Sequence, residues 1–140
     1  MTLALTPEAL IEQRVDAFRA NDFRAIFDSY HSSAPFLDFF PDCNAYLLYA
    51  KTEIAHTFAI KECRILRSKE QGERADVLIS QSILHNGVVF DSLEIARCRR
   101  DDRGNWFFEA GLRLDAQKIS ADPLQCSWDL LIAAGNDLWI

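Results

Sequence analysis

The order of hydrophobic and polar positions divides this chain into a helical first part and a sheet-forming second part. Residues 77–84 are rich in β-branched side chains and contain neither Pro nor Gly, and Asn86-Gly87 follows them. Asn-Gly between two apolar runs is the strongest short-range signal for a β-hairpin. Residues 88–100 then predict the return strand, residues 101–105 a second turn and residues 106–114 a further strand. The pattern predicts an antiparallel meander, preceded by a strand at residues 58–67 and a charged turn at residues 68–74.

Helical signals precede this sheet. Thr6 can cap a helix in whose first turn Pro7 fits, and Glu8 favours the positive end of the helix dipole. Apolar residues recur at helical spacing and predict an inward face of Leu10, Ile11, Val15, Ala17 and Phe18. The positions expected outward or at the margin of that face are Glu12, Gln13, Arg14 and Asp16.

Two more helices are expected before residue 58. Asn21-Asp22 breaks the first helix and can cap a second, whose apolar stripe is Phe23, Ile26, Phe27 and Tyr30. Asp42 is expected to cap a third helix that reaches about Ile54. The connection between Pro35 and Pro41 is too apolar to lie bare in water, so we expect it to cap the open end of the fold with Phe36, Phe39 and Phe40.

The C-terminal part predicts a last helix and an apolar tail. Asp122-Pro123 is a helix start, the helix is expected to run to about Ala134, and Gly135 is a good stop. The tail of Leu138, Trp139 and Ile140 needs cover, as does the outer face of a sheet that is apolar on both sides. A homodimer is the expected solution, since two-fold pairing is the commonest symmetry. The alternative is that the last helix folds back over the outer face and leaves a monomer.

Length and element order together predict the fold class. A chain of 140 residues and 16.0 kDa is long enough for a single domain over residues 1–140, with a core that needs no disulfide or metal. Helices followed by a meander predict an α+β fold, in which N-terminal helices pack on a curved antiparallel sheet and an extra helix follows at the C-terminus.

Composition limits the classes of partner. Fifteen basic and 21 acidic side chains give a net charge of -6, which disfavours nucleic-acid binding. No apolar run approaches the roughly 20 residues of a membrane span, and no signal peptide is found, so we expect a cytoplasmic protein without a membrane partner. The spacing of the four Cys and three His residues fits no metal site, so neither a metal nor another cofactor is predicted.

Two patches of sequence carry a resemblance to a known family. Residues 7–18, with Asn21-Asp22-Phe23 and Tyr30-His31-Ser32, look like the opening of the YchJ middle domain, and residues 97–108 resemble a hairpin of that family. The chain thus resembles the nuclear-transport-factor-2-like (SnoaL-like) superfamily, and is most similar in pattern to the YchJ middle-domain branch. The resemblance implies a cone-shaped fold with a pocket between sheet and helices. It implies no single activity, because this superfamily hosts enzymes, transport factors and plain binding domains.

Candidate site residues are those expected to reach such a pocket. Tyr30 and His31, with Asp38 nearby in sequence, are the candidate acid–base cluster. The alternative is that His31 lies at the C-terminus of a helix, where its positive charge interacts favourably with the helix dipole, and that Tyr30 is part of the hydrophobic core. Glu94 is a candidate pocket carboxylate; the alternative is that it faces solvent or pairs with an arginine such as Arg97 or Arg113. Alternation along the strand does not decide which face looks inward. The full set expected to line the pocket is Phe27, Phe36, Phe39, Phe40, Tyr49, Glu94 and Trp106.

The predicted function is binding of a small apolar molecule, or association as a dimeric module. The alternative is a small acid–base enzyme, an isomerase, dehydratase or hydrolase, that uses Tyr30, His31 and Asp38. An enclosed pocket with a carboxylate touching Tyr30 or His31 favours the enzyme, whereas an interior filled by Phe and Leu side chains favours a structural role.

Overall fold

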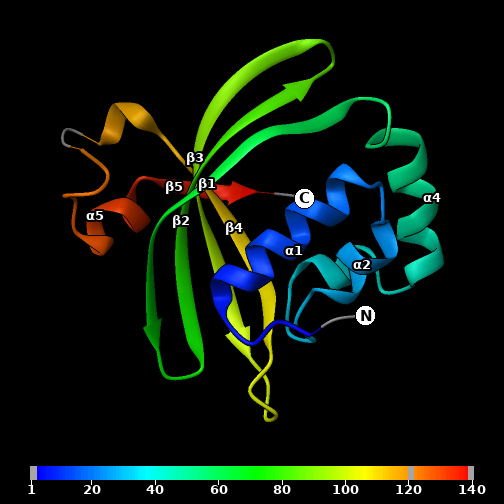
Figure 1. Ribbon diagram of the computed structural model, residues 1–140, viewed down its shortest axis with the longest axis horizontal. Coiled ribbons are helices and arrows are strands. Elements are labelled where there is room, and N and C mark those ends of the chain that lie inside the picture. The colour runs from blue at the N-terminus through cyan, green and yellow to red at the C-terminus, as the bar shows by residue number, and fades with distance from the viewer. Residues whose placement is uncertain (1–2, 120–121, 139–140) are drawn as a thin grey trace.

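The chain forms an antiparallel sheet with helices at both of its ends (Figure 1). The computed structural model describes residues 3–119 and 122–138, apart from the side chains of 137 and 138. Within these residues the helices before the sheet are α1 (Pro7–Arg19), α2 (Phe23–Asp28), α3 (Phe36–Phe39) and α4 (Cys43–Glu53). The sheet contains β1 (Phe58–Gln71), β2 (Arg74–His85), β3 (Val88–Arg100), β4 (Trp106–Leu114) and β5 (Gly135–Leu138) in that spatial order. Between β4 and β5 lie a short 3-10 helix η1 (Ala116–Lys118) and α5 (Trp128–Ala133). This arrangement confirms the predicted α+β fold class.

The expected helix starts are confirmed by their caps. The Thr6 hydroxyl accepts a hydrogen bond from the backbone N–H of Ala9, and the Asp22 carboxylate accepts one from Ala25. Asp42 caps α4 in the same way through the N–H of Asn44. Each cap satisfies a backbone donor that the first helical turn leaves unpaired.

The predicted meander is confirmed, with one correction. His85 pairs with Val88 across the two-residue turn Asn86-Gly87, in which φ is 51° and 83°. Glycine and asparagine are the residues that adopt this left-handed region readily. The charged turn expected over residues 68–74 is wrong, because β1 runs on to Gln71 and β2 begins at Arg74. Charged side chains suit this edge strand, since they stay in solvent while the backbone pairs.

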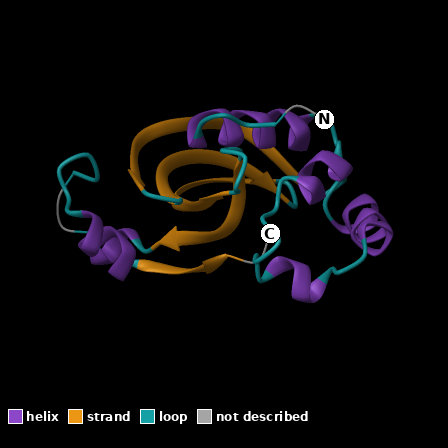
Figure 2. Cartoon of the chain, turned by 90° about the horizontal axis from the view of Figure 1, so that it is seen from below, coloured by secondary structure: helices purple, strands orange, loops and turns teal. Residues whose placement is uncertain are grey.

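Each face of the sheet is covered by different helices. The helix face, defined as the side toward α1, α2 and α4, shares one core with them through Val77, Ile79, Ala96, Cys98 and Phe108. The outer face, on the opposite side, packs against α5 and the segment before it through Leu78, Ile95, Leu112 and Leu114. Figure 2 shows the strands bending strongly, with α5 at one end of the molecule and the N-terminal helices at the other. The chain therefore covers this part of the outer face itself, as the monomer alternative expected.

The C-terminal segment differs from its prediction in two ways. The helix starts at Trp128 with Ser127 as its cap, whereas Asp122 accepts from the N–H of Leu124 in a preceding turn. Gly135 does not simply stop the helix but begins β5, which pairs with β4. A Cβ on this glycine would lie 3.0 Å from the Cβ of Leu112, a tight contact, so a larger residue would require a small shift of the two strands. Trp139 and Ile140, expected to pack on the body, lie outside the described residues.

Candidate functional site

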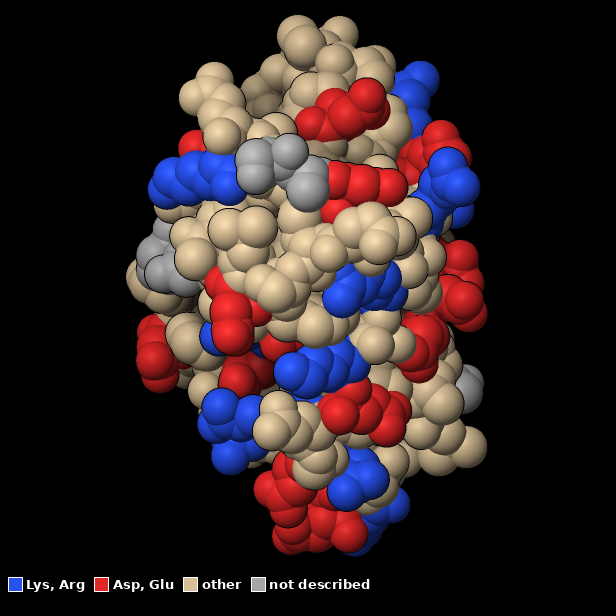
Figure 3. Space-filling model, turned by 90° about the vertical axis from the view of Figure 1, so that its left-hand side faces the viewer, with Lys and Arg blue, Asp and Glu red and all other residues tan. Residues whose placement is uncertain are grey.

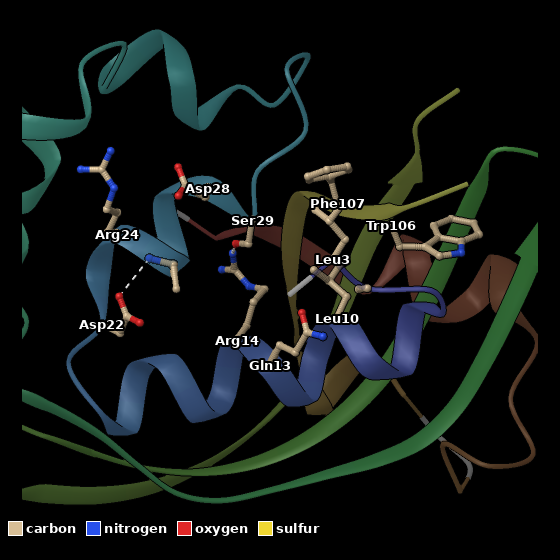
Figure 4. Close-up of a pocket in the computed structure, with 12 residues that line it drawn as sticks. Leu3, Leu10, Gln13, Arg14, Asp22, Arg24, Asp28, Ser29, Trp106 and Phe107 are labelled. Carbon is tan, nitrogen blue, oxygen red and sulfur yellow. Dashed lines mark hydrogen bonds between the residues drawn. The ribbon is translucent and has the colours of Figure 1, made fainter. Parts of the chain in front are cut away.

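The largest cavity described here is a cleft between α1, α2 and the start of β4, with a volume of about 430 Å³ (Figure 4). We call it the α1–α2 cleft. Its apolar lining consists of Leu3, Ala4, Leu10, Ala25, Trp106 and Phe107, and its polar lining of Gln13, Arg14, Asp22, Arg24, Asp28 and Ser29. The sequence placed Trp106 beside a ligand pocket, and it does line this cleft, but the cleft lies on a different side of α1 from the expected pocket.

Arg14 is the buried polar group of the cleft. Its side chain rises from α1 toward Ser29 at the end of α2, as Figure 4 shows, and only 7% of the residue is exposed. Its Nη1 donates a hydrogen bond of 2.5 Å to the Ser29 hydroxyl, which in turn donates to the carbonyl of Ile26. The guanidinium carbon lies 3.9 Å from the ring centre of Phe108 and 4.9 Å from that of Tyr30. Aromatic faces attract such a cation, so the rings hold the positive charge in place.

The burial of Arg14 overturns the expectation that it lies outward or at the margin of the apolar face. The signal was present in the sequence, because Arg14 lies four residues after Leu10 and three before Ala17, both buried on α1. Residues at these spacings share one helix face. A charged residue in the middle of an apolar stripe is therefore the pattern by which this site could have been found.

Charges of both signs surround the cleft entrance. Asp22 is engaged as the cap of α2, and Arg24 is exposed on the same helix. Asp28 is half-buried at the end of α2. Exposed charges are screened by water and salt, whereas a buried one is not. Arg14 therefore dominates the electrostatics of the cleft.

Glu94 lies on the helix face of the sheet, in a second and much smaller cavity. This inner cavity has a volume of about 60 Å³ and is lined by Glu94, Gln81 and Arg14 among apolar residues. The Glu94 carboxylate accepts a 2.7 Å hydrogen bond from Gln81 and lies 3.9 Å from Arg113, one of the two arginine partners considered from the sequence. Burial raises the pKa of Glu94 above its ordinary value, although the Arg113 charge opposes this shift. The structure thus turns Glu94 inward, but into a space that holds only a few water molecules.

Tyr30, His31 and Asp38 do not form a cluster in this fold. Tyr30 is buried and stacks on Phe36 with ring centres 4.0 Å apart, and its hydroxyl has no hydrogen-bond partner among the described residues. His31 faces another way, with Nδ1 lying 2.7 Å from the hydroxyl of Ser33. Asp38 is exposed on α3, and no hydrogen bond or ion pair within the described ranges joins it to Tyr30 or His31.

The other predicted pocket residues belong to an aromatic cluster that fills the space between α2, α3 and α4. Phe36 packs edge-on against Tyr46 with ring centres 5.1 Å apart, and Phe40 lies at the same distance from Tyr49. Phe27 contacts both Phe36 and Tyr46. Phe39 differs from the rest because 61% of it is exposed. These rings contact one another and do not line the α1–α2 cleft.

The described part of the chain offers neither a metal-binding cluster nor a membrane-spanning helix. Over residues 3–119 and 122–138, no group of three or more His, Cys, Asp and Glu side chains could hold a metal ion. None of the helices described has the length and apolar character needed to cross a membrane. Figure 3 shows basic and acidic side chains interspersed on the face that carries α5, without a broad patch of one sign.

The arrangement of helices and strands defines an α+β domain, and solved structures similar to it include a domain with a cystatin-like fold. The chain is similar to RPA3114, a SEC-C motif containing protein from Rhodopseudomonas palustris, with a TM-score of 0.63 and 25% identity over 81% of this chain and 83% of that one. It is also similar to a domain of unknown function with a cystatin-like fold from Nostoc punctiforme, with a TM-score of 0.55 and 14% identity over 75% of this chain and 72% of that one. No family model and no curated protein matches the sequence. These likenesses support the fold class and leave the function to the site itself.

Proposed function

We propose that this domain binds a small organic molecule in the α1–α2 cleft. The observation that carries the proposal is a cavity of about 430 Å³ that combines apolar walls with a buried guanidinium. Ligand sites typically have a volume of about 300–1,000 Å³ and are largely apolar with a few placed polar groups. The cleft has a volume within this range, and half of its lining residues are apolar.

The cleft is a better candidate than the interior between helices and sheet. The inner cavity beside Glu94 measures about 60 Å³, because side chains such as Phe58, Ile79 and Ile83 occupy the space around it. The acid–base alternative finds no support in the positions of Tyr30, His31 and Asp38, which share no contact through which a proton could pass within the described residues. We propose in addition that the chain is related to the YchJ branch of the nuclear-transport-factor-2-like superfamily, on the two sequence patches described above.

A dye titration with a blocked cleft tests the binding proposal. The probe is anilinonaphthalene sulfonate, whose fluorescence rises in apolar surroundings. Ala25 lines the cleft from α2, and Ala25→Trp would fill it. Ala133 is exposed on α5 at the far end of the molecule, so Ala133→Trp is the matched control.

We expect saturable binding of one dye molecule to the wild type and to Ala133→Trp, and at least about tenfold weaker binding to Ala25→Trp. Circular dichroism verifies that both variants are folded. Equal dye binding by Ala25→Trp and the wild type would show that the cleft is not the site.

A further inference from the structure

Arg14 is a buried cation with no carboxylate in direct contact among the described residues, although its charge acts on Glu94, which lines the same inner cavity. The residue is 7% exposed, and no carboxylate of the described residues lies within 4.0 Å of its nitrogens. Arginine carries five N–H donors, and the only hydrogen bond that Arg14 donates within the described chain is the one to Ser29. The aromatic rings of Tyr30 and Phe108 attract its charge but accept no hydrogen bond in the plane of the guanidinium. Buried arginines are otherwise paired with acidic groups.

The nearby carboxylates are engaged elsewhere. Glu94 lines the inner cavity together with Arg14, but its oxygens are approached by Gln81, Ser92 and Arg113. Asp22 caps α2. Arg14 lines both the α1–α2 cleft and the small inner cavity, and these are the spaces open to its remaining donors. The cleft alone has room for a partner larger than water.

From this arrangement we infer that the cleft ligand is a monocarboxylate with an apolar body, and that Arg14 binds its carboxylate. The inference rests on the proposed function of the cleft and names the chemistry of its ligand. The flat fork of a guanidinium matches the two oxygens of a carboxylate, with two parallel N–H···O bonds. The apolar body then lies against Leu10, Trp106 and Phe107.

A single negative charge fits this cleft better than a double one. Arg14 supplies one buried positive charge, which a monoanion neutralises. A phosphate monoester carries a charge of about −2 at neutral pH; besides Arg14, the charged residues of the lining are Asp22, Asp28 and Arg24, so its second charge would meet a net negative charge. A carboxylate is therefore favoured over a phosphate.

Three probes of matched shape test this inference by titration calorimetry. They are 2-naphthoate, 2-naphthamide and 2-naphthyl phosphate, which share one ring system and differ in the charge of the head group. We expect the wild type to bind naphthoate at least about tenfold more tightly than naphthamide, because each charge-assisted hydrogen bond contributes about that factor. Naphthyl phosphate is expected to bind more weakly than naphthoate.

Variants of Arg14 assign the effect to this residue. Arg14→Met keeps the apolar stem and is expected to bind naphthoate at least about tenfold more weakly while binding naphthamide unchanged. Arg14→Lys keeps the charge without the fork and is expected to restore part of the loss. Arg64→Met is the control, since Arg64 is exposed on β1 and does not line the cleft.

The wild-type comparison alone can overturn the inference, whether or not the variants fold. Equal affinity for naphthoate and naphthamide, tighter binding of naphthyl phosphate, or no naphthoate binding at millimolar concentration would each overturn it. The proposed function fails separately, through unchanged dye binding in Ala25→Trp. If Ala25→Trp abolishes dye binding but the wild type binds naphthoate and naphthamide equally, the proposal that the cleft binds a small molecule stands. The inference that this molecule is a carboxylate then fails.

Discussion

Replacing Arg14 with methionine should leave the protein equally stable or make it more stable. A residue kept for binding costs stability in the unbound protein, whereas a residue kept for structure contributes to it. Among the described residues, Arg14 makes one hydrogen bond, to Ser29, and contacts with aromatic rings. These interactions offset the loss of water around the charge of a residue that is only 7% exposed. Methionine would fill much of the same volume without a charge.

The magnitude follows from two opposing contributions. A hydrogen bond from a charged donor stabilises by about 1.5–3 kcal/mol, and the desolvation of a buried ion costs several kcal/mol. Ser29 still donates to the carbonyl of Ile26 after the replacement, so no donor loses its partner. Exchange of buried charges for apolar side chains is often neutral or stabilising by about 1–4 kcal/mol. We therefore expect Arg14→Met to raise the free energy of unfolding by about 1–2 kcal/mol.

Urea unfolding, monitored by circular dichroism, measures this change in the free energy of unfolding. Arg64→Met is the exposed control, and its free energy of unfolding is expected within about 0.5 kcal/mol of the wild type. Arg14→Ala separates packing from charge, because it removes the stem as well. It should be less stable than Arg14→Met by about 2 kcal/mol or more. The opposite result is a free energy of unfolding for Arg14→Met that is more than about 2 kcal/mol below that of the wild type, at an unchanged dependence on urea concentration. The hydrogen bond and the ring contacts would then outweigh the cost of desolvation, and the argument that a ligand completes the site would be refuted.

Three further predictions concern the outer face, the inner cavity and self-association. Leu131→Ala should lower the free energy of unfolding by about 3 kcal/mol, since Leu131 is fully buried, whereas its exposed neighbour Leu130→Ala should stay within about 1 kcal/mol; equal losses in urea unfolding would contradict the packing of α5 on the sheet. Burial raises the pKa of Glu94 above the 4.5 of the unfolded chain, so the folded state holds the proton to higher pH and the Glu94 contribution to stability falls as pH rises above that value. Glu94→Gln should therefore gain stability relative to the wild type as the pH rises above 4.5, and parallel pH profiles of the two proteins would refute this. The homodimer remains a proposal from the sequence: light scattering at micromolar concentration should give a mass near twice 16.0 kDa, and a mass near 16.0 kDa would leave the outer-face cover to α5 alone.

The elements predicted from the sequence are those whose cause lies within a few residues of chain. The Asn86-Gly87 turn needs only two residues that tolerate positive φ, and it fixes the pairing of β2 with β3. The caps Thr6 and Asp22 act on backbone donors three residues away. Such local interactions can be recognised without knowing what packs around them, and the α+β class follows from their order.

The features of the fold that the sequence did not predict depend on contacts between segments that are distant in the sequence. β5 is a strand because β4 offers an edge and Gly135 fits against Leu112, although the segment itself carries no strand signal. Glu94 faces the helices because its neighbours Leu93 and Ile95 pack on the α5 side, a choice that two similarly apolar faces left open. Burial is a property of the assembled layers, so alternation alone could not assign it.

The candidate site shows the same division between sequence and structure. The sequence by itself determined that Arg14 lies on the helical stripe of Leu10 and Ala17, because the helical repeat sets that position. Only the tertiary structure decided that this charge is buried, since the groups that enclose it come from α2 and β4, where Ser29 accepts its hydrogen bond and Phe108 covers its face. The energy of a buried charge depends on which groups surround it, and those groups meet only when the chain has folded.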